Sequence, residues 1–309
     1  MPWLSVLVPV YNGAATLAES LGSLVGQAEG VEVLLVDQGS KDDSRAIAES
    51  FADRLDLTII DAPENRNWVQ NTNLALSRAQ APHATMLHQD DLWRPGRAAL
   101  LRRMIDRAPD AALYLHAADY IDANGRTVGQ FAPGFSATPR SLTSEDALAR
   151  LLVQNTVALP AAAFPTEIAR EAGGLDQSLW YTADWDFWLK LTRRGPVHWS
   201  PERRAAFRLH GGSQTVTGSR DLDDFAAQLA TPLERHLTAL PARLRAPVRK
   251  RAEASNALNL WMAARFHGTP RPTRPLLAQL AALGPTNWGP FWRDARVFQR
   301  VLPRLRLRR

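Results

Sequence analysis

Short apolar runs alternate with segments of helical apolar spacing over the first hundred residues. The apolar runs occupy residues 4–10, 31–36, 57–60 and 84–87. Helical spacing follows the first three runs, at residues 14–25, 41–51 and 69–79. A nearly continuous apolar run is typical of a strand that is buried on both faces of a parallel sheet. The alternation therefore predicts an α/β, Rossmann-like fold in which helices flank a mostly parallel central sheet.

The pattern changes twice along the rest of the chain. Residues 111–116 read as a further strand, and residues 122–125 as a turn. Beyond residue 216 the strand pattern is lost, and helices are expected at 221–240 and 247–266, before a proline-rich break. We therefore expect three parts: residues 1–100 and 101–215 as the two halves of one domain, and 216–309 as a C-terminal helical extension.

Polar side chains stand where the predicted strands end. Tyr11 follows the first strand, Asp37 the second, and Asp90 and Asp91 the fourth. In an open α/β sheet, ligands bind at the carboxyl ends of the strands, and paired carboxylates there suit Mg²⁺ that also contacts phosphate oxygens. Each residue also has an ordinary structural interpretation: a turn or helix cap for the aspartates, and a partly buried ring for Tyr11.

Four motifs, in order, resemble those of the family 2 nucleotide-sugar glycosyltransferases. They lie at residues 5–12, 36–40, 87–95 and 173–189. The resemblance covers roughly residues 3–215 and implies a GT-A type fold. It also implies an inverting, metal-dependent enzyme that moves a sugar from a nucleoside diphosphate to a hydroxyl of a glycan or lipid-linked glycan. Cell-surface polysaccharide synthesis is the expected setting.

The resemblance assigns the donor-binding residues. Asp37 matches the aspartate that binds the base, and Pro9 and Tyr11 match positions that line the nucleotide pocket. Asp90 and Asp91 match the last two acids of the motif that binds ribose and metal, with Asp90 on the nucleotide sugar and Asp91 on Mg²⁺ or Mn²⁺.

The same resemblance assigns the residues around the reacting sugar. Asp184 matches the catalytic base, and His210 matches a histidine that closes the site near the metal and the diphosphate. Trp185 is our candidate for stacking on the acceptor sugar. The loop at 131–143 could cover that acceptor. Without the resemblance, Asp184 is better explained as an acid that favours the helix dipole.

Three positions depart from the family pattern. His88 stands where the first acid of the metal motif is usual, Gln38 where a second aspartate is common, and Ala183 where a glutamate is common. Histidine still binds metal or diphosphate, so His88 is kept as a further ligand. These departures leave a catalytically inactive nucleotide-sugar-binding protein as an alternative. A nucleotidylyltransferase is less favoured, because the glycine- and lysine-rich phosphate loop expected near the first strand is missing.

Composition narrows the setting. The chain has 309 residues, no cysteine and a formal net charge of +6, and no apolar stretch approaches the ~18 residues of a membrane span. We expect a cytoplasmic protein, with a place at the inner face of the cell membrane left open. Residues 297–309 alternate apolar and basic side chains, which fits either peripheral membrane contact or docking on the protein body. No nucleic-acid-reading motif accompanies the basic charge, so no nucleic acid partner is expected.

Overall fold

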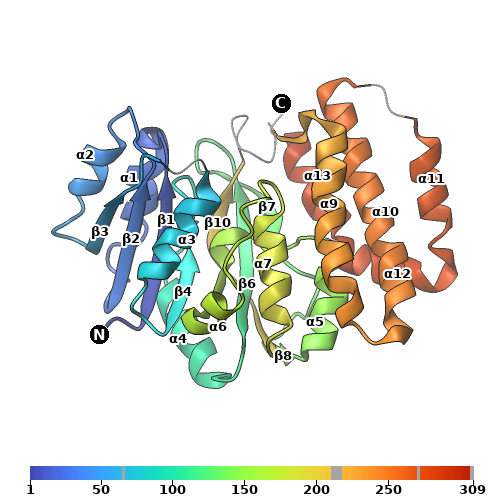
Figure 1. Cartoon of the computed structure of the whole chain (residues 1–309), viewed down its shortest axis with the longest axis horizontal. Coiled ribbons are helices and arrows are strands. Elements are labelled where there is room, and N and C mark those ends of the chain that lie inside the picture. The colour runs from blue at the N-terminus through green and yellow to red at the C-terminus, as the bar shows by residue number, and fades with distance from the viewer. Residues whose placement is uncertain (65–66, 210–217, 270–271, 307–309) are drawn as a thin grey trace.

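A ten-stranded sheet forms the centre of the protein, and helices cover its faces (Figure 1). The computed structural model describes residues 1–64, 67–209, 218–269 and 272–306. The strands are β1 (Leu4–Val10), β2 (Val31–Asp37), β3 (Asp56–Asp61), β4 (His83–Met86), β5 (Leu92–Trp93), β6 (Leu113–Ile121), β7 (Thr127–Phe131), β8 (Arg140–Leu142), β9 (Ala162–Pro165) and β10 (Val197–Arg208). The helices before residue 210 are α1 (Ala14–Gly22), α2 (Ser44–Glu49), α3 (Trp68–Arg78), α4 (Arg97–Arg107), α5 (Ser144–Leu151), α6 (Thr166–Glu171) and α7 (Ala183–Thr192), with a short 3₁₀ helix η1 (Leu159–Ala161).

The first half of the sheet is parallel and contains a topological switch point. The strands lie in the order β3-β2-β1-β4, so the chain winds outward in one direction from β1 and then returns to add β4 on its other side. Every residue of β1 and β2 is buried, as the continuous apolar runs predicted. A switch point opens a crevice at the carboxyl ends of its two strands, here β1 and β4. The predicted fold class is confirmed.

The second half of the sheet is mixed. Strand β9 runs antiparallel between β4 and β6, and β10 runs parallel to β6. The carboxyl end of β10 pairs with the short antiparallel strand β5, which brings Arg208 next to Asp90 and Asp91. The segment 131–143, which we expected to be a loop, includes strand β8, because residues 140–142 pair with β10.

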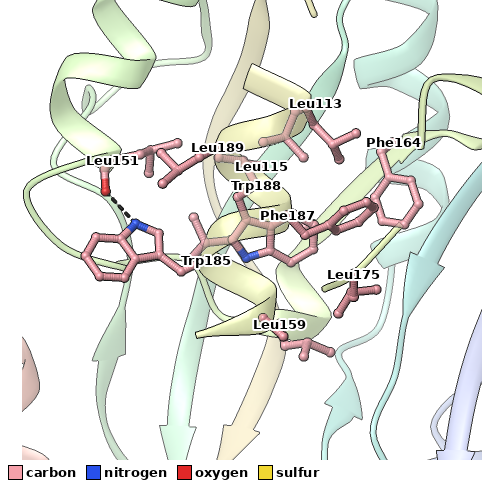
Figure 2. Packing of buried hydrophobic residues seen from close by; sticks show 14 of the residues in the cluster. Leu113, Leu115, Leu151, Leu159, Phe164, Leu175, Trp185, Phe187, Trp188 and Leu189 are labelled. Carbon is pink, nitrogen blue, oxygen red and sulfur yellow. Dashed lines mark hydrogen bonds between the residues drawn. The ribbon is translucent and has the colours of Figure 1, made fainter. Parts of the chain in front are cut away.

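Helix α7 is buried on nearly all sides, as a helix in the middle of a core must be. Phe187, Trp188 and Leu189 have no exposed surface, and Phe164 of β9 packs edge-on against Phe187. Figure 2 shows part of this cluster, in which the indole N–H of Trp185 points to the carbonyl oxygen of Leu151. The packing fixes the first turn of α7 relative to the sheet.

The C-terminal extension is built onto this core. Its described helices are α9 (Leu222–His236), α10 (Ala242–His267), α11 (Arg274–Ala281), α12 (Gly284–Ala295) and α13 (Val297–Arg306), with 3₁₀ helices η2 (Gly218–Arg220) and η3 (Leu237–Ala239). Phe225, Leu229 and Val248 belong to the same buried apolar cluster as Leu7 of β1 and Trp188 of α7. The expected division at residue 215 lies outside the described residues.

The basic tail forms a helix that packs on the sheet. Pro303 of α13 is buried against Gly129 of β7, where an added Cβ would come 2.4 Å from the proline ring. This contact is the docking that we had considered as one of two arrangements for the tail. Within the described parts of the chain, no helix combines the length and the apolar character needed to cross a membrane.

Candidate active site

Two cavities meet beside the first turn of α7. The larger, about 860 Å³, lies at the switch point between β1 and β4, and the smaller, about 350 Å³, lies between the sheet and helices α9, α10 and α13. The two cavities share four lining residues: Leu159, Tyr181, Asp184 and Phe207. Asp184 is the one carboxylate among them. A group bound in either cavity would therefore lie close to that side chain.

The larger cavity gathers several residues that the sequence singled out. Pro9, Tyr11, His88, Asp90 and Asp184 all line it. The ring of Tyr11 is 51% exposed, so its face is open to a flat ligand. The peptide groups of Tyr11 are held by one side chain that sequence reasoning missed: Gln89 accepts a hydrogen bond from the Tyr11 N–H at 2.8 Å and donates one to its carbonyl at 3.1 Å.

Asp37 lies behind this lining. It is buried at the end of β2, and its Oδ1 accepts hydrogen bonds from the backbone N–H of Ser40 at 3.0 Å and from the Ser40 hydroxyl at 2.6 Å. These bonds form the turn that we had considered as its structural interpretation. The neighbouring Gln38 lines the cavity instead, and its Oε1 accepts from Asn71 at 3.4 Å.

His88 and Asp91 present buried polar atoms at the end of β4. His88 packs edge-on against Trp68, and burial lowers the pKa of its imidazole, which keeps the ring neutral at physiological pH. Asp91 accepts a hydrogen bond from the Arg208 N–H at 3.0 Å, yet burial and the charge of Asp90 raise the pKa of Asp91 well above its usual value. His88 Nε2 and Asp91 Oδ2 have no hydrogen-bond partner among the described residues.

Arg208 fixes the loop that carries these two aspartates. Its guanidinium is almost fully buried and donates to the carbonyl oxygen of Asp90 at 2.8 Å and to Glu19 at 2.5 Å. Arg208 also lines the larger cavity. Arg208 was not singled out from the sequence, because its contacts come from residues more than eighty positions away.

The polar atoms at this loop are of the kinds that bind a hard cation, although of His88 and Asp91 only His88 lines the larger cavity. Neutral imidazole nitrogen and carboxylate oxygen both bind divalent metals, and Mg²⁺ usually takes one or two carboxylates and completes its shell with water and phosphate oxygens. In the part of the chain that the structure describes, no three His, Asp or Glu side chains converge as a metal site by themselves. His210, the other predicted ligand, lies outside the described residues.

Asp184 has the properties of a base that works near neutral pH. Burial raises the pKa of Asp184 to about 6, and it outweighs three hydrogen bonds that favour the charged form. They come from Asn155 Nδ2 at 2.9 Å, from the backbone N–H of Trp185 at 2.7 Å, and from the backbone N–H of Asp184 itself. Asn155 follows α5 and lies in none of the motifs, so it was not identified from the sequence.

Two aromatic side chains near Asp184, Trp185 and Tyr181, differ in how much of their surface is exposed. Trp185 lines the smaller cavity but is only 1% exposed, and its indole N–H donates to the Leu151 carbonyl at 2.7 Å. A ring with so little free surface offers a sugar a small stacking area. Tyr181 is partly exposed and borders both cavities, so it presents more aromatic surface beside the base.

Comparisons with known proteins relate the chain to glycosyltransferases. Residues 5–154 match the family model of glycosyl transferase family 2. An uncharacterized glycosyltransferase of Rickettsia typhi is 25% identical over 230 residues, which is 73% of this chain and 70% of that protein. The succinoglycan biosynthesis protein ExoU of Rhizobium meliloti is 31% identical over 138 residues, which is 44% of this chain and 39% of ExoU.

Two solved structures share the fold. TarS of S. aureus, in complex with UDP-GlcNAc, superposes with a TM-score of 0.61 at 18% identity, covering 97% of this chain and 92% of that one. The mannosyltransferase PcManGT of Pyrobaculum calidifontis, in complex with GDP-Man and Mn²⁺, gives a TM-score of 0.59 at 19% identity, covering 99% and 87%. The chain has the GT-A-like fold, and its residues 5–154 belong to glycosyl transferase family 2.

Proposed function

We propose that the protein transfers a sugar from a nucleoside diphosphate to a hydroxyl group, with inversion at the anomeric carbon. The observation that carries the proposal is the position of Asp184. Its carboxylate borders the cavity that Pro9, Tyr11 and Asp90 line and also the separate cavity on its other side. A base in that position can contact an acceptor hydroxyl while the donor sugar lies within reach of the same hydroxyl.

The larger cavity is the proposed donor site. Tyr11 and Pro9 would contact the nucleotide base. Asp37 would support this part of the site from the end of β2, and Asp90 would contact the ribose. The structural neighbours TarS and PcManGT bind UDP-GlcNAc and GDP-Man, so we take nucleotide sugars as the ligand class. A volume of about 860 Å³ lies in the range of pockets that hold ligands of this size.

The chemistry follows from one base and one direct displacement. Asp184 takes the proton of the acceptor hydroxyl as the oxygen attacks the anomeric carbon, and the bond from that carbon to the diphosphate breaks. General-base catalysis of this kind contributes roughly 10² to 10⁴ in rate. Mg²⁺ or Mn²⁺, held by Asp91, His210 and His88, would stabilise the negative charge on the leaving diphosphate. The buried Nε2 of His88 and Oδ2 of Asp91 are the atoms that favour this assignment.

The smaller cavity is the proposed acceptor site. Aromatic side chains from the sheet and the extension line it, among them Tyr120, Phe131, Tyr181 and Trp261. Such rings stack on the apolar faces of sugars or pack on a lipid chain. We therefore propose a glycan or lipid-linked glycan acceptor, with Tyr181 rather than the buried Trp185 as the main stacking surface. The relative ExoU acts in succinoglycan biosynthesis, which supports a place in polysaccharide synthesis.

The test measures release of nucleoside diphosphate and donor binding side by side. Wild-type protein should release diphosphate from at least one of a panel of nucleotide sugars when Mg²⁺ or Mn²⁺ is present. Asp184→Asn should lower this turnover by at least about a hundredfold and keep donor affinity, whereas Asp91→Ala should lose the metal-dependent part of donor binding.

Binding without turnover in the wild type would contradict the proposal and favour an inactive nucleotide-sugar-binding protein, which His88, Gln38 and Ala183 made conceivable. Full turnover by Asp184→Asn would remove the base assignment. The anomeric configuration of the product, read by NMR, tests inversion directly.

A further inference from the structure

Four apolar side chains near the C-terminus form a surface that we call the aromatic patch: Trp288, Trp292, Phe298 and Leu302. The rings of Trp292 and Phe298 are stacked, with centroids 5.4 Å apart and planes 11° from parallel, and Trp288 also stacks with Trp292, with centroids 6.2 Å apart. Phe298 is 66% exposed, Leu302 49% and Trp292 43%. Stacked aromatic rings with this much free surface are unusual on a globular protein without a binding role.

Helices α12 and α13 each pack one face against the protein and leave the other face exposed, and the aromatic patch lies on the exposed faces. Phe291 and Val297 point into a buried apolar cluster, and Pro303 packs on Gly129 of β7. Between the helices, Arg296 adopts a left-handed conformation with φ of 47°, which ends α12, and Phe298 in the first turn of α13 stacks on Trp292. The inner faces therefore hold the helices in place, and the exposed rings are available to contact a binding partner.

Charge identifies the partner. Residues 242–309 contain fifteen Lys and Arg against two acidic residues, although the whole chain has a net charge of only +6. The rest of the chain therefore carries more acidic than basic side chains. Four of the last six residues are arginines, and only Pro303 separates them from Leu302 in sequence. Two copies of so basic a segment repel each other, whereas an anionic surface attracts it.

We propose that the aromatic patch docks on an anionic lipid surface. Aromatic rings of tryptophan prefer the boundary between headgroups and acyl chains, and neighbouring basic side chains are attracted to anionic headgroups. Arg300 and Val301 of α13 line the smaller cavity, so docking through Phe298 and Leu302 of the same helix would place that cavity next to the membrane. The proposal concerns binding alone and does not depend on the transferase reaction.

Vesicle co-sedimentation tests this proposal with the full chain. Wild-type protein should sediment with vesicles of equal parts phosphatidylcholine and phosphatidylglycerol, should bind pure phosphatidylcholine much more weakly, and should be released by added salt. The double variant Trp292→Ser/Phe298→Ser should bind the anionic vesicles at least roughly tenfold more weakly, because each large apolar side chain contributes on that order when it is buried.

Leu277→Ser is the matched control. Leu277 is 58% exposed on α11, a helix of the same extension, and it lies outside the patch, so its variant should bind as wild type. Phe298→Ser alone, at the most exposed ring, serves as a second variant whose thermal unfolding should match that of wild type. Wild-type protein that stays in the supernatant, or a double variant that binds as wild type, would overturn the proposal. The proposal would also be overturned if light scattering showed a wild-type dimer, the double variant were monomeric, and neither protein bound vesicles.

Discussion

At the scale of single residues, the hydrogen bond between Asn155 and Asp184 sets the charge state of the proposed base. Burial raises the pKa of Asp184 to about 6, and the Asn155 amide acts against that rise by favouring the carboxylate. The base is active when it is deprotonated. Turnover should therefore increase as pH rises through about 6 and level off above it.

Asn155→Ala should move this rising limb to higher pH. Removal of the N–H donor leaves the desolvation of Asp184 less opposed, so its pKa should increase by roughly half a unit to one unit. The measurement is the pH profile of kcat/KM, and the loss of activity should be largest at low pH and small above pH about 8.

Asn259→Ala is the control for that profile. Asn259 lines the same smaller cavity but its amide donates to Gln154 rather than to Asp184. Its variant should leave the pH of the rising limb unchanged. An Asn155→Ala profile that is lower at every pH by the same factor would show that Asn155 has only a structural role.

At the scale of elements, the apolar runs predicted β1 and β2 because a strand buried on both faces needs continuous apolar sequence. Tyr11 and Asp90 could be predicted to lie at one crevice because they follow the carboxyl ends of β1 and β4, and the carboxyl ends of parallel strands meet at one edge of the sheet. Asn155, Gln89 and Arg208 could not be found in this way, because their partners come from distant segments. The contact of Pro303 with β7 could not be predicted for a similar reason, because it leaves no local sequence pattern.

Close approach between elements gives a sharp test of how the extension is docked. An added Cβ at Gly134, in the segment between β7 and β8, would come 2.2 Å from the carbonyl oxygen of Arg293 in α12. That oxygen is backbone and can yield only if the helix moves. Gly134→Ala should therefore lower the free energy of unfolding by roughly 1 to 3 kcal/mol, as overpacking does, measured by denaturant titration.

Gly22→Ala provides the comparison on the opposite part of the fold. No heavy atom lies within 4 Å of a Cβ at this position, which is in the last turn of α1. Alanine there should be neutral or stabilising by up to about 1 kcal/mol, because it favours helix more than glycine does. Equal stability of the two variants would mean that α12 does not approach Gly134 as closely as the structure shows.

At the scale of the whole molecule, the extension and the sheet share one core. Leu7 of β1, Trp188 of α7, and Leu229 of α9 belong to the same cluster of buried side chains. The proposed base lies at the start of α7, between the two parts, and the smaller cavity takes its lining from both. The proposed acceptor site therefore exists only when the extension is folded onto the sheet.

Because the core is shared, a destabilising substitution in the extension should also lower the stability of the sheet. Leu229→Ala removes a side chain that is 2% exposed, and such a truncation typically costs roughly 2 to 5 kcal/mol. If the molecule unfolds as one unit, hydrogen exchange should show the most protected amides of β1 and β2 losing as much protection as those of α9. Leu277→Ala, at an exposed position of α11, should change neither by more than about 0.5 kcal/mol. Loss of protection confined to residues 222–267 would instead mean that the helices open independently, and the proposed acceptor site would then be able to disassemble while the donor site stays folded.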